Sequence, residues 1–158
     1  MPELPSLGRR GGGWVALQFV LMAVIVAVCV FGQRWPDPVQ IPLAVLGVGL
    51  QLAGGALVVW SSRLLGRNLR PFPRPPRDGA LVEDGPYRVV RHPIYSGAVL
   101  FFAGLSLALS PLALVPTAVL AVVLALKSAV EERFLQEAFP TYRPYADRTR
   151  WRLVPLIY

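Results

Sequence analysis

Charged residues are scarce in this chain. Asp, Glu, Lys and Arg make up 16% of its 158 residues, whereas hydrophobic residues make up 54%. An ordinary soluble domain carries about 25% charged residues, and a disordered chain is poor in apolar residues and rich in charge. The composition therefore argues against both classes and indicates a single membrane domain over residues 1–158, provided that the apolar residues come in long runs.

Cysteine is almost absent as well. The chain has one, Cys29, which excludes an internal disulfide and any metal site built from several cysteines. Because Cys29 lies in an apolar run, we interpret it as a small packing residue. We expect no metal site.

Four apolar segments can cross a membrane. A helix needs about 20 residues to span the hydrocarbon core. The segments cover residues 14–31, 41–60, 94–109 and 114–126, and the last helix should continue to residue 139. Ser110, Pro111 and Pro116 mark a tight turn between the third and fourth segments. We therefore predict an all-α polytopic membrane protein whose third and fourth spans form an antiparallel hairpin.

The basic residues orient these spans. Among 15 arginines and one lysine, only Arg34 lies between spans one and two, and none lies between spans three and four. The others precede span one, fall in the loop 61–93, or follow span four. The positive-inside rule places both termini, this loop and the tail 140–158 in the cytoplasm. The excess of arginine over lysine, with abundant alanine, valine and proline, suggests a prokaryotic cell membrane.

Small and polar residues within the spans predict helix contacts. Gln18 and Gln51 are expected to form hydrogen bonds between helices. Gly49 and Ala53, extended by residues 54–56, form a small-xxx-small pattern that is typical of closely packed membrane helices.

The loop 61–93 is too long for a simple connector. Residues 70–76 are rich in proline and arginine and should be extended against anionic head groups. Pro93 is suited to the first turn of the third span. That helix start presents unpaired N–H groups and a positive dipole end, which favour an anion such as a carboxylate.

The hairpin brings the start of span three and the end of span four to the same depth. Arg91 and His92 should therefore face Glu131 and Glu132 across one cytoplasmic rim. This combination suits a zwitterionic ligand that also carries a cation. A glutamate can bind an ammonium, and the helix start, Arg91 or His92 can bind a carboxylate. The rings of two nearby tyrosines, Tyr87 and Tyr95, can face a sulfonium or stack on a base.

Each of these residues also has an ordinary structural interpretation. His92 can cap a helix, and the glutamate pair can be a solvated helix face. Lys127 and Glu131 can form an ion pair along the helix. The tyrosines and the basic tail can anchor the protein at the membrane surface. The combination of these residues carries more information than any one of them.

Two segments of the chain form distinctive motifs. Residues 85–97 read Gly-Pro-Tyr-Arg-Val-Val-Arg-His-Pro-Ile-Tyr-Ser-Gly. The second motif is a Glu-Glu pair after a span, followed by Phe, Tyr-x-x-Tyr, Arg and a late Pro, and it is formed by Glu131, Glu132, Phe139, Tyr142, Tyr145, Arg148 and Pro155. The two motifs resemble the two signatures of integral-membrane methyltransferases, which include the isoprenylcysteine carboxyl methyltransferases and the phospholipid methyltransferases. The match covers residues 70–155, about half of the chain.

The resemblance implies S-adenosyl-L-methionine as a cofactor, bound at the cytoplasmic rim without a Rossmann domain. The resemblance and the chemistry of the individual residues together assign cofactor binding to Gly79, Ala80, Leu81, Val82, Tyr87, Arg91, His92, Pro93, Ile94, Tyr95, Glu131 and Glu132. Lys127 and Arg148 are assigned to substrate binding. His92 and Glu131 are the candidate catalytic residues, because an amine acceptor would have to lose a proton.

The expected reaction is methyl transfer to a lipophilic acceptor that enters from the bilayer. A prenylated cysteine carboxylate, a lipid amine, a small thiol and an isoprenoid acid all fit this class. One alternative is an NADPH-dependent membrane reductase related to sterol reductases. Another is a non-enzymatic scaffold whose loop arginines, Arg70, Arg74 and Arg77, bind anionic membrane lipids. Nucleic-acid binding is not expected, because membrane topology accounts for the arginines.

Overall fold

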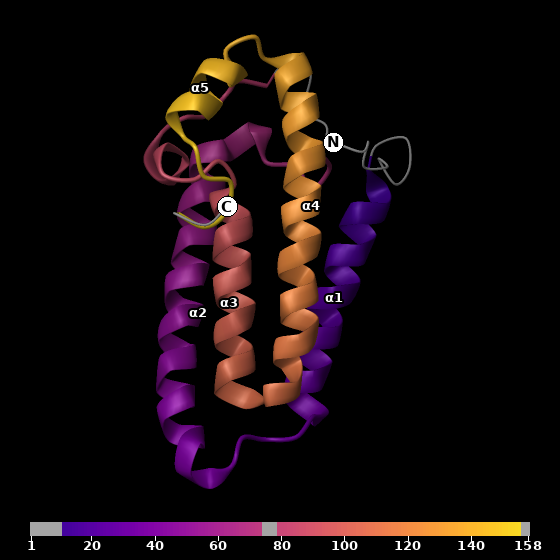
Figure 1. The fold of residues 1–158 in the computed structure, drawn as a ribbon, viewed down its shortest axis with the longest axis vertical. Helices are drawn as coiled ribbons and strands as arrows, with labels where there is room; N and C mark the ends of the chain where they lie inside the picture. The colour runs from indigo at the N-terminus through magenta and orange to yellow at the C-terminus, as the bar shows by residue number, and fades with distance from the viewer. Residues whose placement is uncertain (1–10, 74–78, 156–158) are drawn as a thin grey trace.

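The computed structural model of the chain describes residues 11–73 and 79–155 and is a bundle of long helices (Figure 1). The four long helices are α1 (Gly12–Phe31), α2 (Asp37–Leu65), α3 (Pro93–Leu109) and α4 (Leu114–Ala138), and the short helix α5 (Tyr142–Arg148) lies at one end. Three 3₁₀ turns join them: η1 (Gly66–Asn68), η2 (Gly85–Arg88) and η3 (Pro111–Ala113). Over the described residues, regular structure is entirely helical, which confirms the predicted all-α fold.

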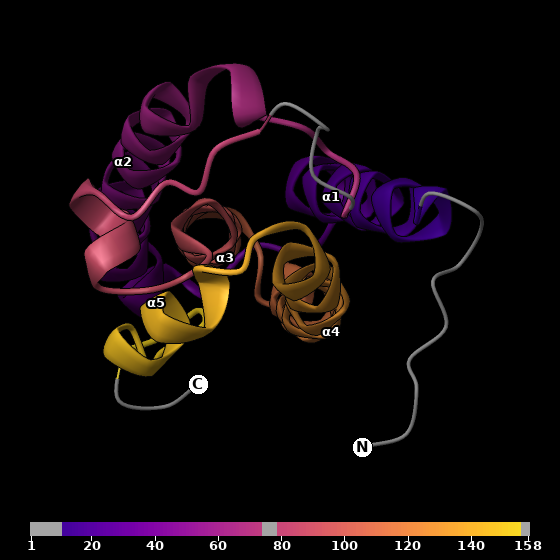
Figure 2. The same cartoon turned by 90° about the horizontal axis from the view of Figure 1, so that it is seen from above.

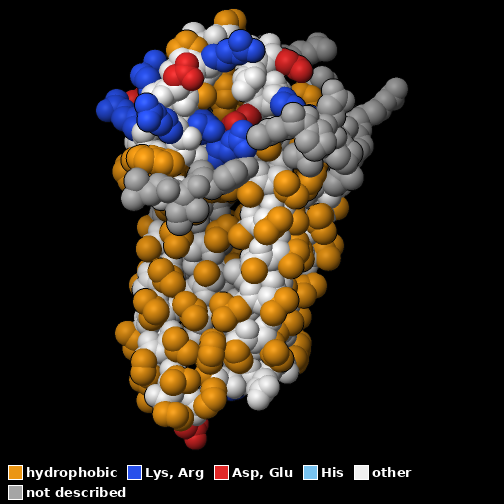
Figure 3. Space-filling model, viewed as in Figure 1, with side chains coloured by type: hydrophobic (Ala, Val, Ile, Leu, Met, Phe, Trp, Pro, Cys, Tyr) orange, Lys and Arg blue, Asp and Glu red, His pale blue; other side chains and the backbone are white. Residues whose placement is uncertain are grey.

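The bundle is long and apolar enough to cross a membrane. The helical stretches Gly12–Phe31, Asp37–Asn68 and Pro111–Ala138 each meet the length and hydropathy of a span, and α3 is a shorter apolar helix of 17 residues. Apolar side chains cover the long face of the bundle that Figure 3 shows, and Ile41, Val45 and Leu52 are each at least 70% exposed. Exposed apolar surface of this extent is expected where lipid covers the protein. The chain is an integral membrane protein.

Arginine and acidic side chains gather at one end of the bundle (Figure 3). We call this the arginine-rich end and define it by residues 66–73, 79–92 and 139–155. The helix α1 begins at this end, α2 and α4 finish there, and α3 starts there (Figure 1). Residues 74–76 of the predicted extended segment 70–76 lie outside the described residues.

The second helix is longer than the predicted span of residues 41–60. It begins at Asp37 and continues through Leu65. Ser61, Ser62 and Arg63 are polar but compatible with a helix, so the backbone continues after the apolar run has ended. The helix stops at Gly66, whose φ of 51° is one that glycine adopts easily.

Glycines bring α2 and α3 into close contact, and this is the most extensive helix contact in the bundle. A Cβ atom on Gly47 would lie 2.4 Å from the carbonyl oxygen of Gly104, and one on Gly54 would lie 2.5 Å from that of Gly97. Small residues at such positions let membrane helices approach closely. The predicted Gly49 contact is wrong, because a Cβ there would meet nothing within 4 Å.

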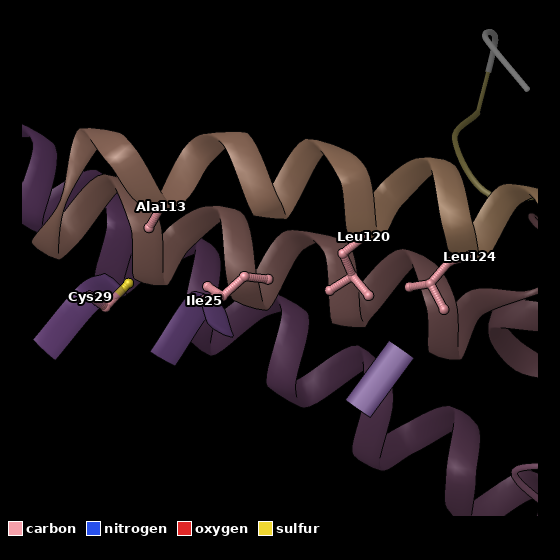
Figure 4. Close-up of a cluster of buried hydrophobic side chains, with 5 residues drawn as sticks. All are labelled: Ile25, Cys29, Ala113, Leu120 and Leu124. Carbon is pink, nitrogen blue, oxygen red and sulfur yellow. The ribbon is translucent and has the colours of Figure 1, made fainter. Parts of the chain in front are cut away.

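Viewed from above, α3 lies between α2 and α4, and α1 packs mainly on α4 (Figure 2). A buried cluster joins α1 to α4 and η3 (Figure 4); it consists of Ile25, Cys29, Ala113, Leu120 and Leu124. Cys29 is 1% exposed, which confirms its interpretation as a packing residue. This packing holds α1 and α4 together below the arginine-rich end.

Candidate functional site

The 3₁₀ turn η2, before α3, packs against α2 and α5 and has Pro86 and Tyr87 buried. Gly85 opens η2 with a φ of 58°, and a Cβ there would lie 2.7 Å from Cδ1 of Leu64. Tyr87 follows and is 6% exposed. The hydroxyl of Tyr145 on α5 donates a hydrogen bond to the carbonyl of Tyr87 over 2.8 Å. The turn is therefore a structural part of the bundle end.

The C-terminal segment fixes the start of α3. The N–H groups of Arg91 and His92 donate to the carbonyls of Trp151 and Arg152, each over 2.9 Å. The hydroxyl of Ser96 also hydrogen-bonds to the carbonyl of Leu153. Sequence reasoning missed this role of the tail. The tail holds the His-Pro segment from outside the hairpin.

Glu132 is the centre of a buried ion network. Its Oε1 accepts a bond from Nε of Arg91 over 2.7 Å and lies 3.3 Å from Nε2 of His92. Its Oε2 accepts from Nε of Arg152 over 2.9 Å. Nη1 of Arg91 also donates to the carbonyls of Thr149, over 2.7 Å, and Arg150, over 2.9 Å. The network binds the tail and the α3 start to α4.

Glu131, the preceding residue of α4, points towards Tyr95. The hydroxyl of Tyr95 donates to its Oε2 over 2.8 Å, and Nδ1 of His92 lies 3.6 Å from the same oxygen. The rings of His92 and Tyr95 are stacked, with centroids 5.5 Å apart. Because Nε2 of His92 faces Glu132, this ring bridges the two carboxylates. The prediction that the α3 start and the glutamate pair face each other is confirmed.

Lys127 lies one helical turn below Glu131 and is fully buried. Its Nζ donates to Oε1 of Gln18 on α1 over 2.6 Å and lies 5.2 Å from the centre of the Tyr95 ring. This bond confirms that Gln18 makes a contact between helices. No ion pair within 4 Å joins Lys127 to Glu131, although both residues are described.

A cavity of about 320 Å³ lies within the arginine-rich end, enclosed by α1, α3, α4 and the segment after α2. This volume is at the lower limit for small-molecule sites. Most of the predicted site residues line it: Gly79, Ala80, Leu81, Val82, Tyr87, Arg91, His92, Ile94, Tyr95, Lys127 and Glu131. Its walls are mainly apolar, with a few converging charged groups.

Three of the predicted site residues do not line this cavity. Pro93 is buried in the first turn of α3, where it starts the helix. Glu132 faces Arg91 and Arg152 instead. Arg148 forms an ion pair of 2.6 Å with Glu83, and 63% of its side chain is exposed. The structure therefore turns these three side chains away from the cavity, and their binding roles stay predictions.

The cavity also has walls formed by residues that were not among the predicted site residues. Asn68 exchanges two hydrogen bonds with the backbone of Ala80, over 3.0 and 3.2 Å, and so fixes residues 79–82 beside η1. Leu135 and Phe139 from the end of α4, and Tyr142 from α5, complete the wall. Phe139 and Tyr142 belong to the second signature. Asn68 is a polar residue in a loop, and nothing in the sequence around it indicates a place at the cavity.

The aromatic side chains at this end remain uncharged at neutral pH. Burial raises the pKa of Tyr87, Tyr142 and Tyr145 well above the usual tyrosine value. Tyr142 is 1% exposed and its hydroxyl has no hydrogen-bond partner among the described residues. These side chains therefore offer neutral hydroxyls and ring faces.

A membrane-embedded helical bundle with a partly polar cavity at its charged end defines a polytopic membrane protein with a candidate small-molecule site. The chain belongs to the phospholipid methyltransferase family, whose family model matches residues 43–142. This match runs from α2 to the start of α5, so it contains the first predicted signature and the second as far as Tyr142, and it leaves α1 outside.

The chain is also similar to a protein of Cupriavidus metallidurans named "Cobalt-zinc-cadmium resistance protein CzcN". The two are 33% identical over 146 residues, which cover 89% of this chain and 62% of that protein. The chain thus spans less than two thirds of the length of this relative. Over residues 11–73 and 79–155, no three His, Cys, Asp or Glu side chains are grouped so that they could hold a metal ion.

Proposed function

We propose that the protein transfers a methyl group from S-adenosyl-L-methionine to a lipophilic acceptor at the arginine-rich end. The observation that carries this proposal is the position of Glu131. Its carboxylate lies within the cavity, against His92 and Tyr95 of the family signature. Membership in the phospholipid methyltransferase family supports the reaction type.

The residues around the cavity fit the chemical groups of this cofactor. Oε2 of Glu131 accepts from Tyr95, but Oε1 has no hydrogen-bond partner among the described residues. A half-paired carboxylate in an apolar wall favours a cationic ligand. The Tyr87 and Tyr95 rings can face a sulfonium, and Leu65, Leu69 and Phe72 offer an apolar surface to a base.

The cofactor supplies an activated methyl group when it is bound, so the protein has to position the reactants and exclude water. Glu132 orients His92 through Nε2, and Glu131 holds the hydroxyl of Tyr95. Arg91 is engaged with Glu132 and with backbone carbonyls, so we assign it to support rather than to cofactor binding. For an amine acceptor, Glu131 or His92 would accept the proton.

Calorimetry with S-adenosylhomocysteine tests this proposal in purified, detergent-solubilised protein. The wild type should bind, and Glu131→Gln should bind at least tenfold more weakly because the carboxylate charge is lost. Glu137→Gln is the matched control, since Glu137 lies exposed on the same helix. NADPH is the second ligand. Binding of NADPH but not of S-adenosylhomocysteine would favour a reductase and would refute methyl transfer.

We also propose that the arginine-rich end faces the cytoplasm, as the distribution of basic residues predicts. In a Cys29→Ala background expressed in bacteria, Arg88→Cys and Gln33→Cys place single cysteines at exposed positions on opposite ends. A membrane-impermeant maleimide should label Gln33→Cys in intact cells and Arg88→Cys only after lysis. The reverse pattern would place this end outside the cell.

A further inference from the structure

Two opposite charges lie one helical turn apart on α4 without forming an ion pair. Lys127 and Glu131 both line the cavity, whose walls are mainly apolar. Side chains four positions apart on a helix can reach each other, and opposite charges attract more strongly in such surroundings than in water. Both residues are described, and no ion pair within 4 Å joins them. Other contacts therefore hold the two side chains apart.

Each charge has a neutral hydrogen-bond partner instead. Nζ of Lys127 donates to Oε1 of Gln18 over 2.6 Å, and Oε2 of Glu131 accepts from the hydroxyl of Tyr95 over 2.8 Å. The Tyr95 ring also lies 5.2 Å from Nζ of Lys127, a distance at which a ring attracts a cation. Because Gln18 carries no charge, it stabilises the ammonium without changing the negative charge of Glu131.

The packing of α1 on α4 fixes Gln18 beside Lys127. Trp14, one turn before Gln18 on α1, belongs to a buried cluster with Val123 and Val130. These two valines lie about one turn to either side of Lys127 on α4. An ammonium can only donate, so the amide oxygen of Gln18 has to face it. The acceptor is therefore supplied in a fixed position by α1, which lies outside the segment that the family model matches.

We infer that Gln18 is a positioning residue that holds Lys127 away from Glu131 and so keeps the Glu131 carboxylate available to a cationic ligand. Without the amide, the ammonium would need another acceptor, and Oε1 of Glu131 can serve as one. An ion pair there would neutralise the carboxylate, and a ligand cation would have to break it. This inference rests on the proposed function, because it takes the cation of S-adenosyl-L-methionine to bind at Glu131.

A double-mutant cycle tests this role by calorimetry with S-adenosylhomocysteine, which keeps the ammonium group of the cofactor. In full-length protein in detergent, Gln18→Leu should weaken binding at least tenfold. In a Lys127→Met background the same substitution should change the affinity less than about twofold, because no lysine is left to pair with Glu131. An equal loss in both backgrounds would overturn the inference, since Gln18 would then act only through the packing of α1.

Two further variants complete the cycle. Gln18→Asn keeps an amide but is one methylene shorter, so it should weaken binding in the same direction with less disturbance of the helix contact. Gln51→Leu on α2, outside the cavity, is the matched control and should bind as the wild type does. Unchanged affinity in both Gln18→Leu and Gln18→Asn would also overturn the inference.

The single lysine of the chain gives a readout that needs no ligand. In protein labelled with ¹⁵N-lysine and reconstituted in nanodiscs, the side-chain resonance reports on Lys127 alone. Glu131→Gln should shift this resonance more in the Gln18→Leu background than in the wild type, because the ion pair forms only there. Equal shifts would overturn the inference, even where S-adenosylhomocysteine binds. If the shifts differ but S-adenosylhomocysteine does not bind to the wild type, the positioning by Gln18 stands and the proposed methyl transfer falls.

Discussion

The hydroxyl of Tyr95 donates to Oε2 of Glu131 over 2.8 Å, and this bond joins the first turn of α3 to the last third of α4. The two residues lie 36 positions apart in the chain and belong to two separate signatures. Their contact places a carboxylate in the wall of the cavity rather than in solvent. The site therefore depends on the hairpin, and no single motif could form it alone.

Glu132 should be needed for stability rather than for ligand contact. Replacing it with Ala leaves Arg91 buried without its carboxylate partner, which typically costs about 3–5 kcal/mol. We expect a clearly lower thermal midpoint in detergent for Glu132→Ala, and an almost unchanged one for Glu137→Ala. If Glu132→Ala unfolds at the wild-type temperature, the network does not have the structural role that its geometry suggests.

Gly54 should tolerate no side chain. A methyl group there would overlap the backbone of Gly97, and overpacking of this kind costs about 1–3 kcal/mol. Gly54→Ala should lower the thermal midpoint, whereas Gly49→Ala should keep or raise it, because its side chain meets nothing and alanine favours helix. Equal midpoints for the two variants would contradict the observed contact between α2 and α3.

Two tyrosines of α5 should differ in their contribution to stability. Tyr145→Phe removes a buried hydrogen bond to the Tyr87 carbonyl and should cost about 1–2 kcal/mol. Tyr142→Phe removes a hydroxyl that has no hydrogen-bond partner in the described part of the chain and should be neutral or slightly stabilising at pH 7. Thermal unfolding of both variants beside the wild type checks this order.

The pKa of Tyr142 adds a dependence on pH. Burial raises it in the folded state, so the folded protein holds this proton more tightly than the unfolded chain does. The resulting stability is complete below the ordinary tyrosine pKa of about 10 and is lost as the pH rises above it. Tyr142→Phe should therefore lose less stability than the wild type at about pH 11. If Tyr142→Phe and the wild type lose the same stability at this pH, deprotonation of Tyr142 is not the cause of the loss.

The sequence predicted the helices well because long apolar runs leave few alternatives. It could not predict where α2 ends, since Ser61, Ser62 and Arg63 suit both a helix and a loop. It correctly predicted close packing at Gly54, but it missed Gly47 and wrongly included Gly49. Gly47 and Gly54 contact α3, whereas Gly49 does not, and this difference depends on the rotation of α2 about its axis, which an almost uniformly apolar helix does not reveal.

The site was predicted as a region more accurately than as a set of side chains. Glu131 and Glu132 are neighbours in sequence, but successive residues point in different directions around a helix. Only the fold shows that Glu131 lines the cavity and that Glu132 pairs with Arg91. The contact between Gln18 and Lys127 joins residues 109 positions apart, and Arg148 turns towards Glu83. Such relationships follow from tertiary packing and leave no local pattern.

The most direct test of the account is methyl transfer itself. Purified protein, S-adenosyl-L-methionine with a labelled methyl group and extracted bacterial membrane lipids are incubated together, and the organic phase is analysed by mass spectrometry. We predict a labelled lipophilic product that forms with the wild type and with Glu137→Gln, and at least tenfold less of it with Glu131→Gln. Equal product with Glu131→Gln, or none with the wild type, would contradict the proposed function.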